Sequence, residues 1–515
     1  MANGMASLMV GSSGLRSAQT ALNTTAHNLS NVNTQGYTRQ QVTFTDTTYA
    51  NVFSSSIVPG KYGLGVDIGA ISRVRNDFID RSYRTEYSRL GFYESQANAV
   101  YEVEDWFGEM QGVTYQQHIT DLYNSINELT KNPTSTIARS SLIQNATAFI
   151  DRSQAIYSGL KDYQITLNTE VSSMVDKINE LGQKIYSLNK SISKVEAGGV
   201  ERANDLRDTR DLALDELSQY LDIDYYETTD GQIIISAENI PFVSKSEVNT
   251  MDVRQEGQYG LLIPEWPAYE KDVFSFEKAA SNANNNDKGK LKGLLVARGT
   301  IDVNYQDVPV MPDKSDYDLT TAEGMAQYNS AMDDYQKQQD YYNKYIEPSA
   351  ILSAIAGFDK LVNGIVTALN DVLCPEKEVE TTTEMTDDEG NPLQADKYVY
   401  NASQYGRLYD RFGNVVEGTD NGDGTYSYTS GEKLYIDEQH TTAEDIDSMT
   451  YLILDMDKAG FGTDEDETVG VELFKRKGTE RYIKITGEDG TTTYVRNNLN
   501  AIGYEIDYTL GNLLV

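Results

Sequence analysis

The chain has 515 residues, enough for three or more domains and a sizeable buried core. Its formal net charge of -36 argues against nucleic acid and against an anionic membrane surface as partners, because both are bound through clustered Lys and Arg. The one cysteine, Cys374, excludes an internal disulfide framework, and no apolar run approaches the length that crosses a membrane.

The first 45 residues differ from the rest of the chain. They contain no Asp, Glu or Lys, and only Arg16 and Arg39 are charged. Leucines recur every seven residues, and a small or apolar residue follows three positions after each: Leu8, Leu15, Leu22 and Leu29, with Gly11, Ala18, Thr25 and Val32. This spacing is that of a coiled-coil seam, so we expect a helix that needs a partner. One more helix of a globular core is the alternative that periodicity leaves open.

The helix is expected to stop in the Asn-rich run that follows Leu29. Asn, Ser and Gly favour a helix end, and Gly36 suits a turn with a positive backbone dihedral. From residue 37 to 45, polar and apolar side chains alternate as they would in an extended strand. The segment is therefore predicted to be a helix, a turn and a strand.

Three further helices are predicted before residue 160. The first runs from about Asp77 to Glu109, and its apolar and aromatic stripe at helical spacing is Phe78, Ile79, Tyr83, Tyr87, Leu90 and Tyr93. The second runs from about His118 to Leu129 and stops at Asn132-Pro133, because proline breaks a helix. The third follows, with Ser135 as its cap.

The clearest periodicity covers residues 160–195. Apolar residues from Leu160 to Val195 alternate in steps of three and four, and Gly198-Gly199 ends the pattern. This predicts a long helix packed against another helix. Packing on the helices that precede it in the chain is favoured over a free dimeric coiled coil.

Residues 204–218 concentrate Asp, Glu and Arg. Such a composition invites a metal site or an acid-base pair, but the spacing favours a helix with an apolar stripe of Leu206, Ala213, Leu214 and Leu217. Asp208 with Arg207, and Arg210 with Asp211, are then expected on the solvated side, where ion pairs contribute little.

The next segments predict a mixture of strands and helices. Alternation over 223–227, the turn signal Thr229-Asp230-Gly231 and the apolar run 233–235 predict a hairpin, and strand patterning continues at 260–263. Residues 317–345 are tyrosine-rich and weakly apolar, typical of a variable helical insertion rather than a binding platform. After Pro348, an apolar seam predicts a helix that ends near Cys374-Pro375.

Residues 376–515 are predicted to form a β-rich domain. Short strands at 434–436, 482–485 and 494–495 are separated by turns of Asp, Glu and Gly. The segment Asp420–Gly424 lacks the carboxylate register and the distal Glu of a calcium loop, so a hairpin turn is expected there. The acidic runs 387–389 and 464–467 are expected on a solvated outer surface.

Catalytic chemistry has little support in the sequence. The three histidines, His27, His118 and His440, have no neighbours at metal-ligand spacing, and the Walker loop, the Gly-x-Ser-x-Gly elbow and the HExxH motif are absent. We therefore expect no enzyme activity, no catalytic residue, no metal and no cofactor. A paired-carboxylate glycosidase in the β-rich part is the alternative that the sequence leaves open.

The amino-terminal segment resembles the signature of bacterial flagellar rod, hook and hook-associated proteins. The likeness is carried by Gly14-Leu15, Ala18, Leu22, Ala26–Asn33 and Thr34–Tyr37, and Gly36–Gln40 is most similar to the hook-associated members. Further similarity lies in Gly63–Val66 with Arg73, Arg75 and Asp77-Phe78, in the Leu-x-Asp-x-Arg-Asp-Leu pattern from Leu206, and in Gly289–Arg298, where such proteins return to their helical domain.

The resemblance implies a structural protein at the junction between flagellar hook and filament. It implies extracellular assembly after type III export without a cleaved signal peptide. The implied partners are further copies of the chain in a ring or helical assembly, the hook protein, the next hook-associated junction protein, the export apparatus and an export chaperone. The implied assembly residues are Leu8, Leu15, Leu22, Asn28, Leu29, Asn31, Asn33, Thr34, Gly36, Tyr37 and Arg39.

The expected fold class is α+β and multidomain, with a coiled-coil or bundle core of long helices and β-rich outer domains. The expected divisions are an assembly core (1–45), a long-helix bundle (46–220), a β-rich domain (221–300), a variable insertion (301–349), a helix returning to the bundle (350–374) and an acidic β-rich outer domain (375–515). The family's chains end in a helix that pairs with the amino-terminal one, whereas this sequence stops at Val515 after strand-like residues, so it is either truncated or different; a chaperone site would then lie outside this chain. The competing hypothesis is a secreted or surface protein with a β-rich ligand-binding or glycoside-hydrolase-like domain on a helical stalk.

Overall fold

A computed structural model describes residues 2–52, 60–108, 115–199, 202–256, 260–278, 280–402, 407–437, 439–457, 472–477, 481–487, 490–497 and 508–515. Long helices and several small sheets give an α+β protein, as predicted. The chain divides into two compact units, which are described one after the other. The first unit contains Met1–Val103, Asp162–Asp302 and Gln339–Ser353, and the second contains Glu104–Lys161, Val303–Gln338 and Ala354–Val515.

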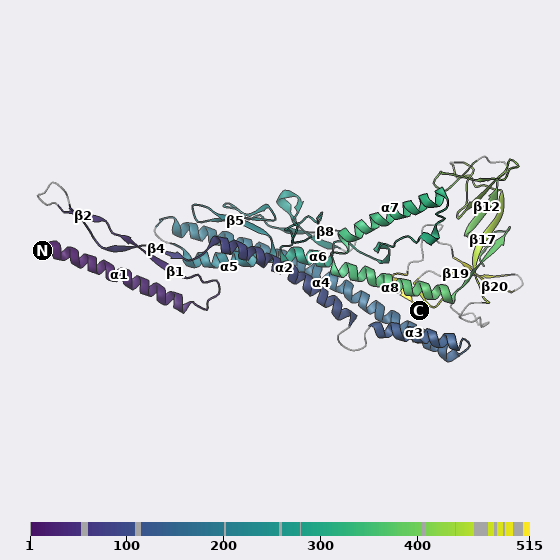
Figure 1. Ribbon diagram of the computed structural model, residues 1–515, viewed down its shortest axis with the longest axis horizontal. Helices are drawn as coiled ribbons and strands as arrows, with labels where there is room; N and C mark the ends of the chain where they lie inside the picture. Colours follow the sequence, from purple (N-terminus) through teal and green to yellow (C-terminus); the bar gives the residue numbers. More distant parts are fainter. Residues whose placement is uncertain are drawn as a thin grey trace. The chain divides into compact units, whose positions relative to one another are not determined.

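The first unit begins with a segment that we call the N-terminal arm, residues 2–52 and 60–75. Helix α1, Ala2–Ser30, lies along an antiparallel ladder of β1, Gln40–Asp46, and β4, Val66–Arg73 (Figure 1). Strands β2, Tyr49–Val52, and β3, Gly60–Gly63, pair beyond that ladder. The predicted order of helix, turn and strand is confirmed, and Gly36 in the turn has a φ of +79°.

Helix α2, Asp77–Phe107, packs against α5, Asn204–Tyr220, and α6, Lys290–Arg298, through small residues. A Cβ at Gly91 would lie 2.5 Å from the carbonyl oxygen of Gln219, and a Cβ at Gly293 would lie 2.5 Å from that of Phe92. The side chains predicted as its apolar stripe lie instead on its exposed side, with Ile79 60% and Leu90 56% exposed. The close approach of backbones therefore decides which face of α2 is buried.

Helix α4, Thr136–Glu196, is a single helix of 61 residues, so the third predicted helix and the long seam are one element. The Ser135 hydroxyl accepts a hydrogen bond from the Ala138 amide at 3.3 Å, which is the predicted cap. The seam from residue 162 onward is buried within the first unit, with Ile178 and Ile185 fully buried. Within the chain it contacts α5 and two small sheets, which follow it in the sequence, so the expectation of preceding helices alone was incomplete.

The two small sheets are antiparallel and three-stranded. The first contains β5, Ile223–Glu227, β6, Ile233–Ala237, and β7, Ile240–Val243, which confirms the predicted hairpin. The second contains β8, Asp252–Glu256, β9, Leu261–Trp266, and β10, Lys271–Asp272. Three asparagines of α4 bind backbone groups of this region, each as donor and acceptor: Asn168 at Gly260 and Leu262, Asn179 at Met251, and Asn189 at Ile233.

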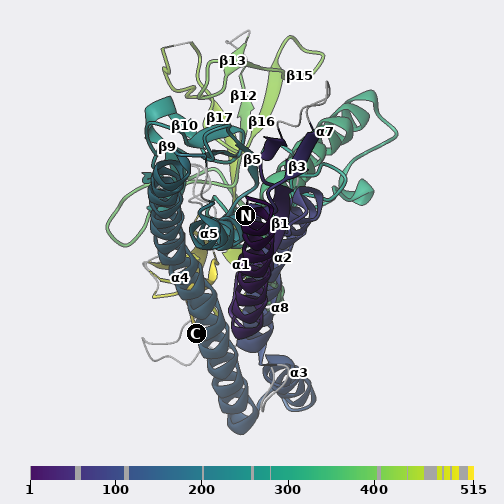
Figure 2. The same ribbon diagram turned by 90° about the vertical axis from the view of Figure 1, so that its left-hand side faces the viewer.

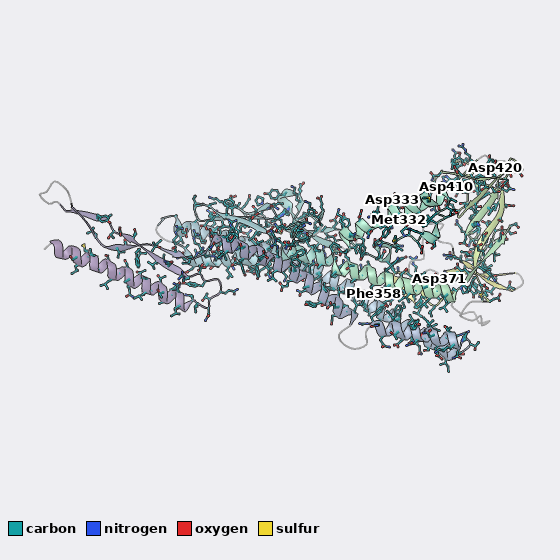
Figure 3. All side chains as sticks on the ribbon, in the orientation of Figure 1. Met332, Asp333, Phe358, Asp371, Asp410 and Asp420 are labelled. Carbon is teal, nitrogen blue, oxygen red and sulfur yellow. The ribbon has the colours of Figure 1, made fainter. Side chains whose placement is uncertain are left out.

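The second unit has a helical part built from α3, Tyr115–Lys131, the first part of α4 and most of α8, Ala350–Leu373. The ring of Tyr115 lies 5.8 Å from that of Phe149 and 5.0 Å from that of Phe358. Helix α7, Ala322–Tyr345, occupies the predicted insertion and carries Met332 and Asp333 (Figure 3).

Helix α8 corrects one expectation. It is long and apolar enough, by length and composition, to cross a membrane, and it is the single such helix in the part of the chain that the structure describes. Its apolar face is that of a core helix, since Ile355 and Val362 are fully buried, and so are the polar Asp359 and Asn370. The buried Cys374 follows its end, where burial raises the pKa of the thiol to about 12.

The β-rich part of the second unit centres on a seven-stranded antiparallel sheet. Its main order is β15, Thr419–Asp420, β16, Tyr426–Ser430, β12, Lys397–Asn401, β17, Ile446–Leu454, β20, Thr492–Arg496, and β19, Tyr482–Thr486, and β11, Glu376–Thr381, also pairs with β17. Figure 2 shows β12 between β16 and β17. Two short pairs complete it, β13, Leu408–Tyr409, with β14, Val415–Val416, and β18, Lys475–Arg476, with β21, Leu513–Leu514.

The turns of the β-rich part are closed by aspartates. At Asp387 and Asp410, the carboxylate accepts hydrogen bonds from the amides two and four residues later, and the Asn at the fourth position donates back to it. Asp410 and Asp420 are labelled in Figure 3. The Asp420–Gly424 segment is the predicted hairpin turn between β15 and β16. The predicted strand 434–436 is reduced to two bridges at Tyr435, and the acidic run 464–467 lies outside the described residues.

Candidate assembly surface

Helix α1 exposes its leucines. Leu8, Leu15, Leu22 and Leu29, which we call the leucine row, are 65–75% exposed, and Val32 beyond them is 71% exposed. Leu8 and Leu29 lie 21 residues apart, so the row is about 30 Å long at the rise of an α-helix. A row of this kind buries its surface only when another helix packs on it.

The opposite side of α1 faces the strands with small polar residues. Ser17 is 4% exposed, and its hydroxyl donates to the Val66 carbonyl at 3.4 Å, while the Val66 amide donates to the Ser13 hydroxyl at 3.2 Å. Gly65 has a φ of +117°, and a Cβ there would overlap the Ser13 hydroxyl. The usual amphipathic arrangement is therefore reversed, with serines inside and leucines outside.

Asn28 joins the end of α1 to the start of β1. Its side-chain oxygen accepts from the Tyr37 hydroxyl at 2.7 Å and from the Gln40 amide at 2.9 Å, and its NH2 group donates to the Gln40 carbonyl at 2.9 Å. The Tyr37 ring also meets His27 edge-on at 5.5 Å. Burial, with smaller effects of the Asp208 and Asp205 charges, raises the pKa of Tyr37. The hydrogen bonds of Asn28 thus fix the turn in which the predicted assembly residues after position 30 lie.

Those other residues differ in their surroundings. Asn31 closes the helix end, since its NH2 group donates to the His27 carbonyl at 3.0 Å and its oxygen accepts from the Thr34 hydroxyl at 3.2 Å. Asn33, Thr34 and Arg39 are exposed. A groove of about 880 Å³ runs between this turn and α1 and includes Leu29, Val32 and Val42. Apolar side chains of the row and of the turn therefore border one groove.

Helix α5 contributes residues that sequence analysis did not assign to this region. Asn204, Asp208, Asp211 and Asp215, which we call the α5 row, are spaced by four, three and four and share one helix face. Arg73 Nη1 donates to Asp208 at 2.8 Å and to Asp211 at 2.6 Å, and the Thr38 amide donates to Asp208 at 3.1 Å. The Asp208 and Asp211 side chains are 9% exposed. Their predicted place on the solvated side was wrong, because the partners lie about 135 to 170 residues earlier in the chain.

The arginines of α5 are buried on its other side. Arg207 donates to Glu196 at 2.7 and 2.8 Å, and Arg210, fully buried, donates to the Gly231 carbonyl at 2.6 Å and to Asn189 at 3.1 Å. Burial lowers the pKa of Arg210 to about 10. The pairs predicted at neighbouring positions are thus absent here, since each charge binds a partner on another element.

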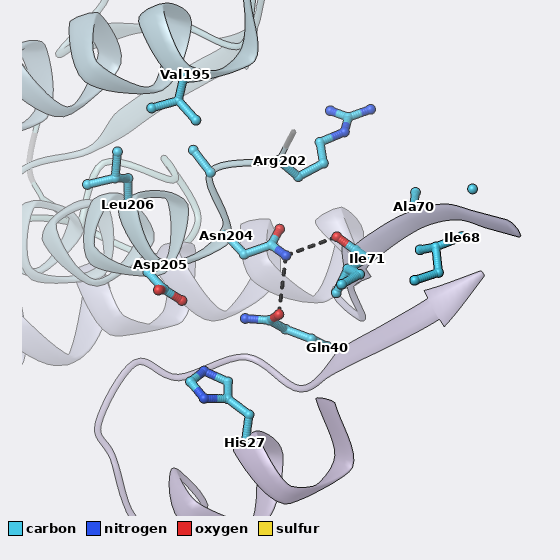
Figure 4. A pocket seen from close by; sticks show the side chains of 12 residues that line it. His27, Gln40, Ile68, Ala70, Ile71, Val195, Arg202, Asn204, Asp205 and Leu206 are labelled. Atoms are coloured by element: carbon cyan, nitrogen blue, oxygen red, sulfur yellow. Dashed lines mark hydrogen bonds between the residues drawn. The ribbon is translucent and has the colours of Figure 1, made fainter. Parts of the chain in front are cut away.

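A second groove, of about 550 Å³, lies beside these contacts (Figure 4). It separates parts of the β1–β4 ladder and the end of α1 from the connection between α4 and α5, and its lining includes His27, Arg202 and Asp205. Asn204 crosses it, donating to the Ile71 carbonyl at 2.9 Å and to the Gln40 side chain at 3.4 Å. The arm is therefore joined to α5 by polar contacts with open space beside them.

The acidic residues of this region make structural contacts. Among the described residues, no group of three or more His, Cys, Asp or Glu is placed to hold a metal ion. The carboxylates of the α5 row bind arginines and backbone amides, which is the chemistry of a structural contact.

Comparisons with known proteins give one consistent family. Residues 100–312 match the model of the flagellar hook-associated protein FlgK helical domain, and residues 8–38 match that of the flagella basal body rod protein. Flagellar hook-associated protein 1 of Bacillus subtilis is 29% identical over 335 residues, which are 61% of this chain and 64% of that protein. The Escherichia coli protein of the same name is 27% identical over 228 residues, 44% of this chain and 41% of that protein.

Among solved structures, the flagellar hook junction protein FlgK from Burkholderia pseudomallei aligns with a TM-score of 0.38 and 14% identity, over 79% of this chain and 68% of that one. The chain thus spans less than two thirds of the length of the two curated relatives described above. The rod-protein model covers most of α1 and the turn after it, the helical-domain model covers α3, α4, α5 and α6, and the relatives share one name. Over these two segments the chain is therefore similar to flagellar hook-associated and rod proteins, and its full-length relatives share the name flagellar hook-associated protein 1.

Proposed function

We propose that this chain is a structural subunit of the bacterial flagellum at the junction between hook and filament, assembled outside the cell. The observation that carries the proposal is the exposed leucine row on a helix without acidic residues, within the part that matches the rod-protein family. Burying one leucine side chain stabilises a contact by about 1.5–3 kcal/mol, and the row repeats that contact along one helix. The role is mechanical and uses no chemistry.

The proposed partners follow from the names of the relatives and from this surface. They are further copies of the chain, the hook protein and the next hook-associated protein. Export would use the flagellar type III apparatus and a chaperone, without cleavage of a signal peptide. The arm suits contact between copies, because two chains of charge -36 repel one another except where their surfaces lack acidic groups.

We assign two roles to the predicted assembly residues. Leu8, Leu15, Leu22 and Leu29 make the contact between helices, and the exposed Asn33, Thr34 and Arg39 extend it at the turn. Asn28, Asn31, Gly36 and Tyr37 shape the turn through the hydrogen bonds and the positive φ described above. The divisions at residues 45, 220, 300, 349 and 374 stay a prediction.

The test is complementation of a strain that lacks the gene. The intact gene is compared with a Leu15→Asp, Leu22→Asp variant and with the matched control Asn23→Asp, which places a charge on α1 next to the row but outside it. Because both leucines are exposed in the chain, the double variant is expected to fold normally and to lose assembly. Filaments are counted by electron microscopy, and filament subunits in the medium by immunoblot.

Three results decide the proposal. It is supported if the deletion strain keeps hooks, sheds filament subunits into the medium and is rescued by the intact gene and by N23D. Rescue by the double leucine variant would show that the leucine row is not the contact. Normal filaments in the deletion strain would rule out the junction function itself.

A further inference from the structure

The α5 row binds separate points of the N-terminal arm. The Asn204 side chain donates a hydrogen bond to the Ile71 carbonyl of strand β4, and the Asp208 carboxylate accepts one from the Thr38 amide in the turn. Asp208 and Asp211 share Arg73, and Asp211 also receives Arg75 at 3.1 Å. Three parts of the arm thus contact one face of α5: the turn, strand β4 and Arg75, which follows β4.

The row extends onto α2 beyond the arm. Asp215 accepts from Arg84 Nε at 2.7 Å, and Arg84 is 4% exposed. Arg75 also binds Asp80 at 2.8 Å, at the start of α2. The charged contacts therefore continue from the arm into α2, the helix that follows the arm in the chain.

An apolar contact and an open groove lie beside these polar contacts between the arm and α5. Gly36 lies against Leu212, where a Cβ would meet that side chain at 3.2 Å, and the groove of about 550 Å³ opens beside the Asn204 contact. Apolar contacts are non-directional, whereas hydrogen bonds to buried carboxylates fix both distance and angle. The direction of the arm is therefore set by polar groups.

Helix α5 itself is held from the other side. Its arginines bind Glu196 at the end of α4 and the Gly231 carbonyl in the β5–β6 turn, and Leu214 and Leu217 are fully buried. The acidic face thus belongs to a helix anchored by α4 and by the first sheet. Because α5 is held in place, the hydrogen bonds of its acidic face can fix the orientation of the arm.

We propose that the α5 row is a positioning site: it holds the N-terminal arm in one direction relative to α5, so that every copy presents its leucine row at the same angle. The proposal rests on the proposed function in taking the leucine row as the assembly contact. It assigns Asp208 and Asp211 a role in assembly although neither side chain belongs to the contact surface.

The test measures the direction of the arm in the full chain. Spin labels are placed at Ser12→Cys on α1 and Gln183→Cys on α4, both exposed, and the native Cys374 is buried, so we expect it to stay unlabelled. Pulsed electron paramagnetic resonance of dilute protein gives the distribution of distances between the labels. One narrow distribution is expected for the parent chain.

Two variants change the ion pair between the arm and α5, one from each side: Asp208→Asn on α5 and Arg73→Gln on β4. Asp208→Asn takes one of two carboxylates from Arg73, and Arg73→Gln takes the shared cation from Asp208 and Asp211, so each weakens the contact and the distance distribution is expected to broaden about twofold. The matched control is Asp205→Asn, an exposed aspartate on the same helix outside the row, which should keep the parent width. The exchange Arg73→Asp with Asp208→Arg should be narrower than either single charge reversal, because it restores the pair.

The helix content of each variant is checked by circular dichroism. If Asp208→Asn disturbs α5, Arg73→Gln decides, since that change lies outside the helix. Parent-like widths for a folded Arg73→Gln variant would overturn the proposal. In cells, normal filaments from a D208N gene whose protein shows the broadened distances would also overturn it. Normal filaments in the deletion strain would instead overturn the proposed function and leave the measured distances valid.

Discussion

Single charged residues of α5 bind partners that are distant in the sequence or lie on other elements. The spacing of residues 206–217 predicts a helix, and α5 is that helix. Its ion pairs could not be predicted, because Arg73 and Glu196 come from other elements and nothing local marks them as partners. Asn28 was predicted as an assembly residue from the family resemblance alone, and both of its hydrogen-bond partners lie within 12 residues in that contiguous motif.

Glu196 should make stability depend on pH in the acid range. Its hydrogen bonds with Arg207 lower the pKa to about 2, whereas the unfolded chain has the ordinary value of 4.5. The unfolded state therefore binds more protons between these values, so the stabilisation is fully present above about pH 4.5 and is lost as the pH falls toward 2. The size is about 1–3 kcal/mol.

The measurement is urea unfolding of the parent and of Glu196→Gln between pH 2.5 and 6. The free energies of unfolding of the two proteins are expected to differ most at pH 6 and to converge toward pH 2.5. The exposed Glu170→Gln is the control and should follow the parent. A constant difference at every pH would contradict the assignment.

Among the elements, α4 shows what periodicity can and cannot reveal. Its seam was predictable because apolar residues repeat over many turns, and its burial confirms that reading. Its sheet partners were not predictable, because Asn168, Asn179 and Asn189 bind backbone groups, which any sequence could supply. The stripe on α2 failed for a related reason, since glycine and serine permit a closer approach than the larger side chains opposite.

Asn189 should be essential for the local stability of β6. It is 1% exposed and binds the Ile233 amide, the Ile233 carbonyl and Arg210. Asn189→Ala leaves these groups unpaired in a buried place, which costs about 1–3 kcal/mol or more. Amide hydrogen exchange of residues 233–237 should therefore speed up by about tenfold to a hundredfold. The neighbouring exposed Lys190→Ala is the control, and equal exchange in both variants would rule this role out.

For the whole molecule, the α+β class and the main helices followed from the sequence, as did the β-rich character of residues 376–515. The order of strands in the seven-stranded sheet did not, because β12 and β17 pair across 45 or more residues and their short alternations fit many partners. The uneven distribution of charge is evident in the sequence itself, since the arm is poor in acidic residues and the whole chain has a net charge of -36.

That charge should make self-association depend on salt. Copies repel one another at low ionic strength, and raising salt from about 20 mM to about 200 mM shortens the screening length to under about 10 Å. Association through the leucine row should therefore increase with salt, as measured by sedimentation velocity. The Leu15→Asp, Leu22→Asp variant should stay monomeric throughout. Association that weakens with salt would mean that ion pairs, rather than leucines, join the copies.

Because α1 exposes its leucines and buries Ser17, the fraction of associated chains should depend on protein concentration. In the isolated chain the leucines gain nothing from folding, so the free energy of burying them appears only when another helix arrives. The arm alone should then melt at a temperature that rises with protein concentration, while the long helices melt at a fixed one. A dilute chain would stay single, and a crowded one would join its neighbours without any change in the fold of its body.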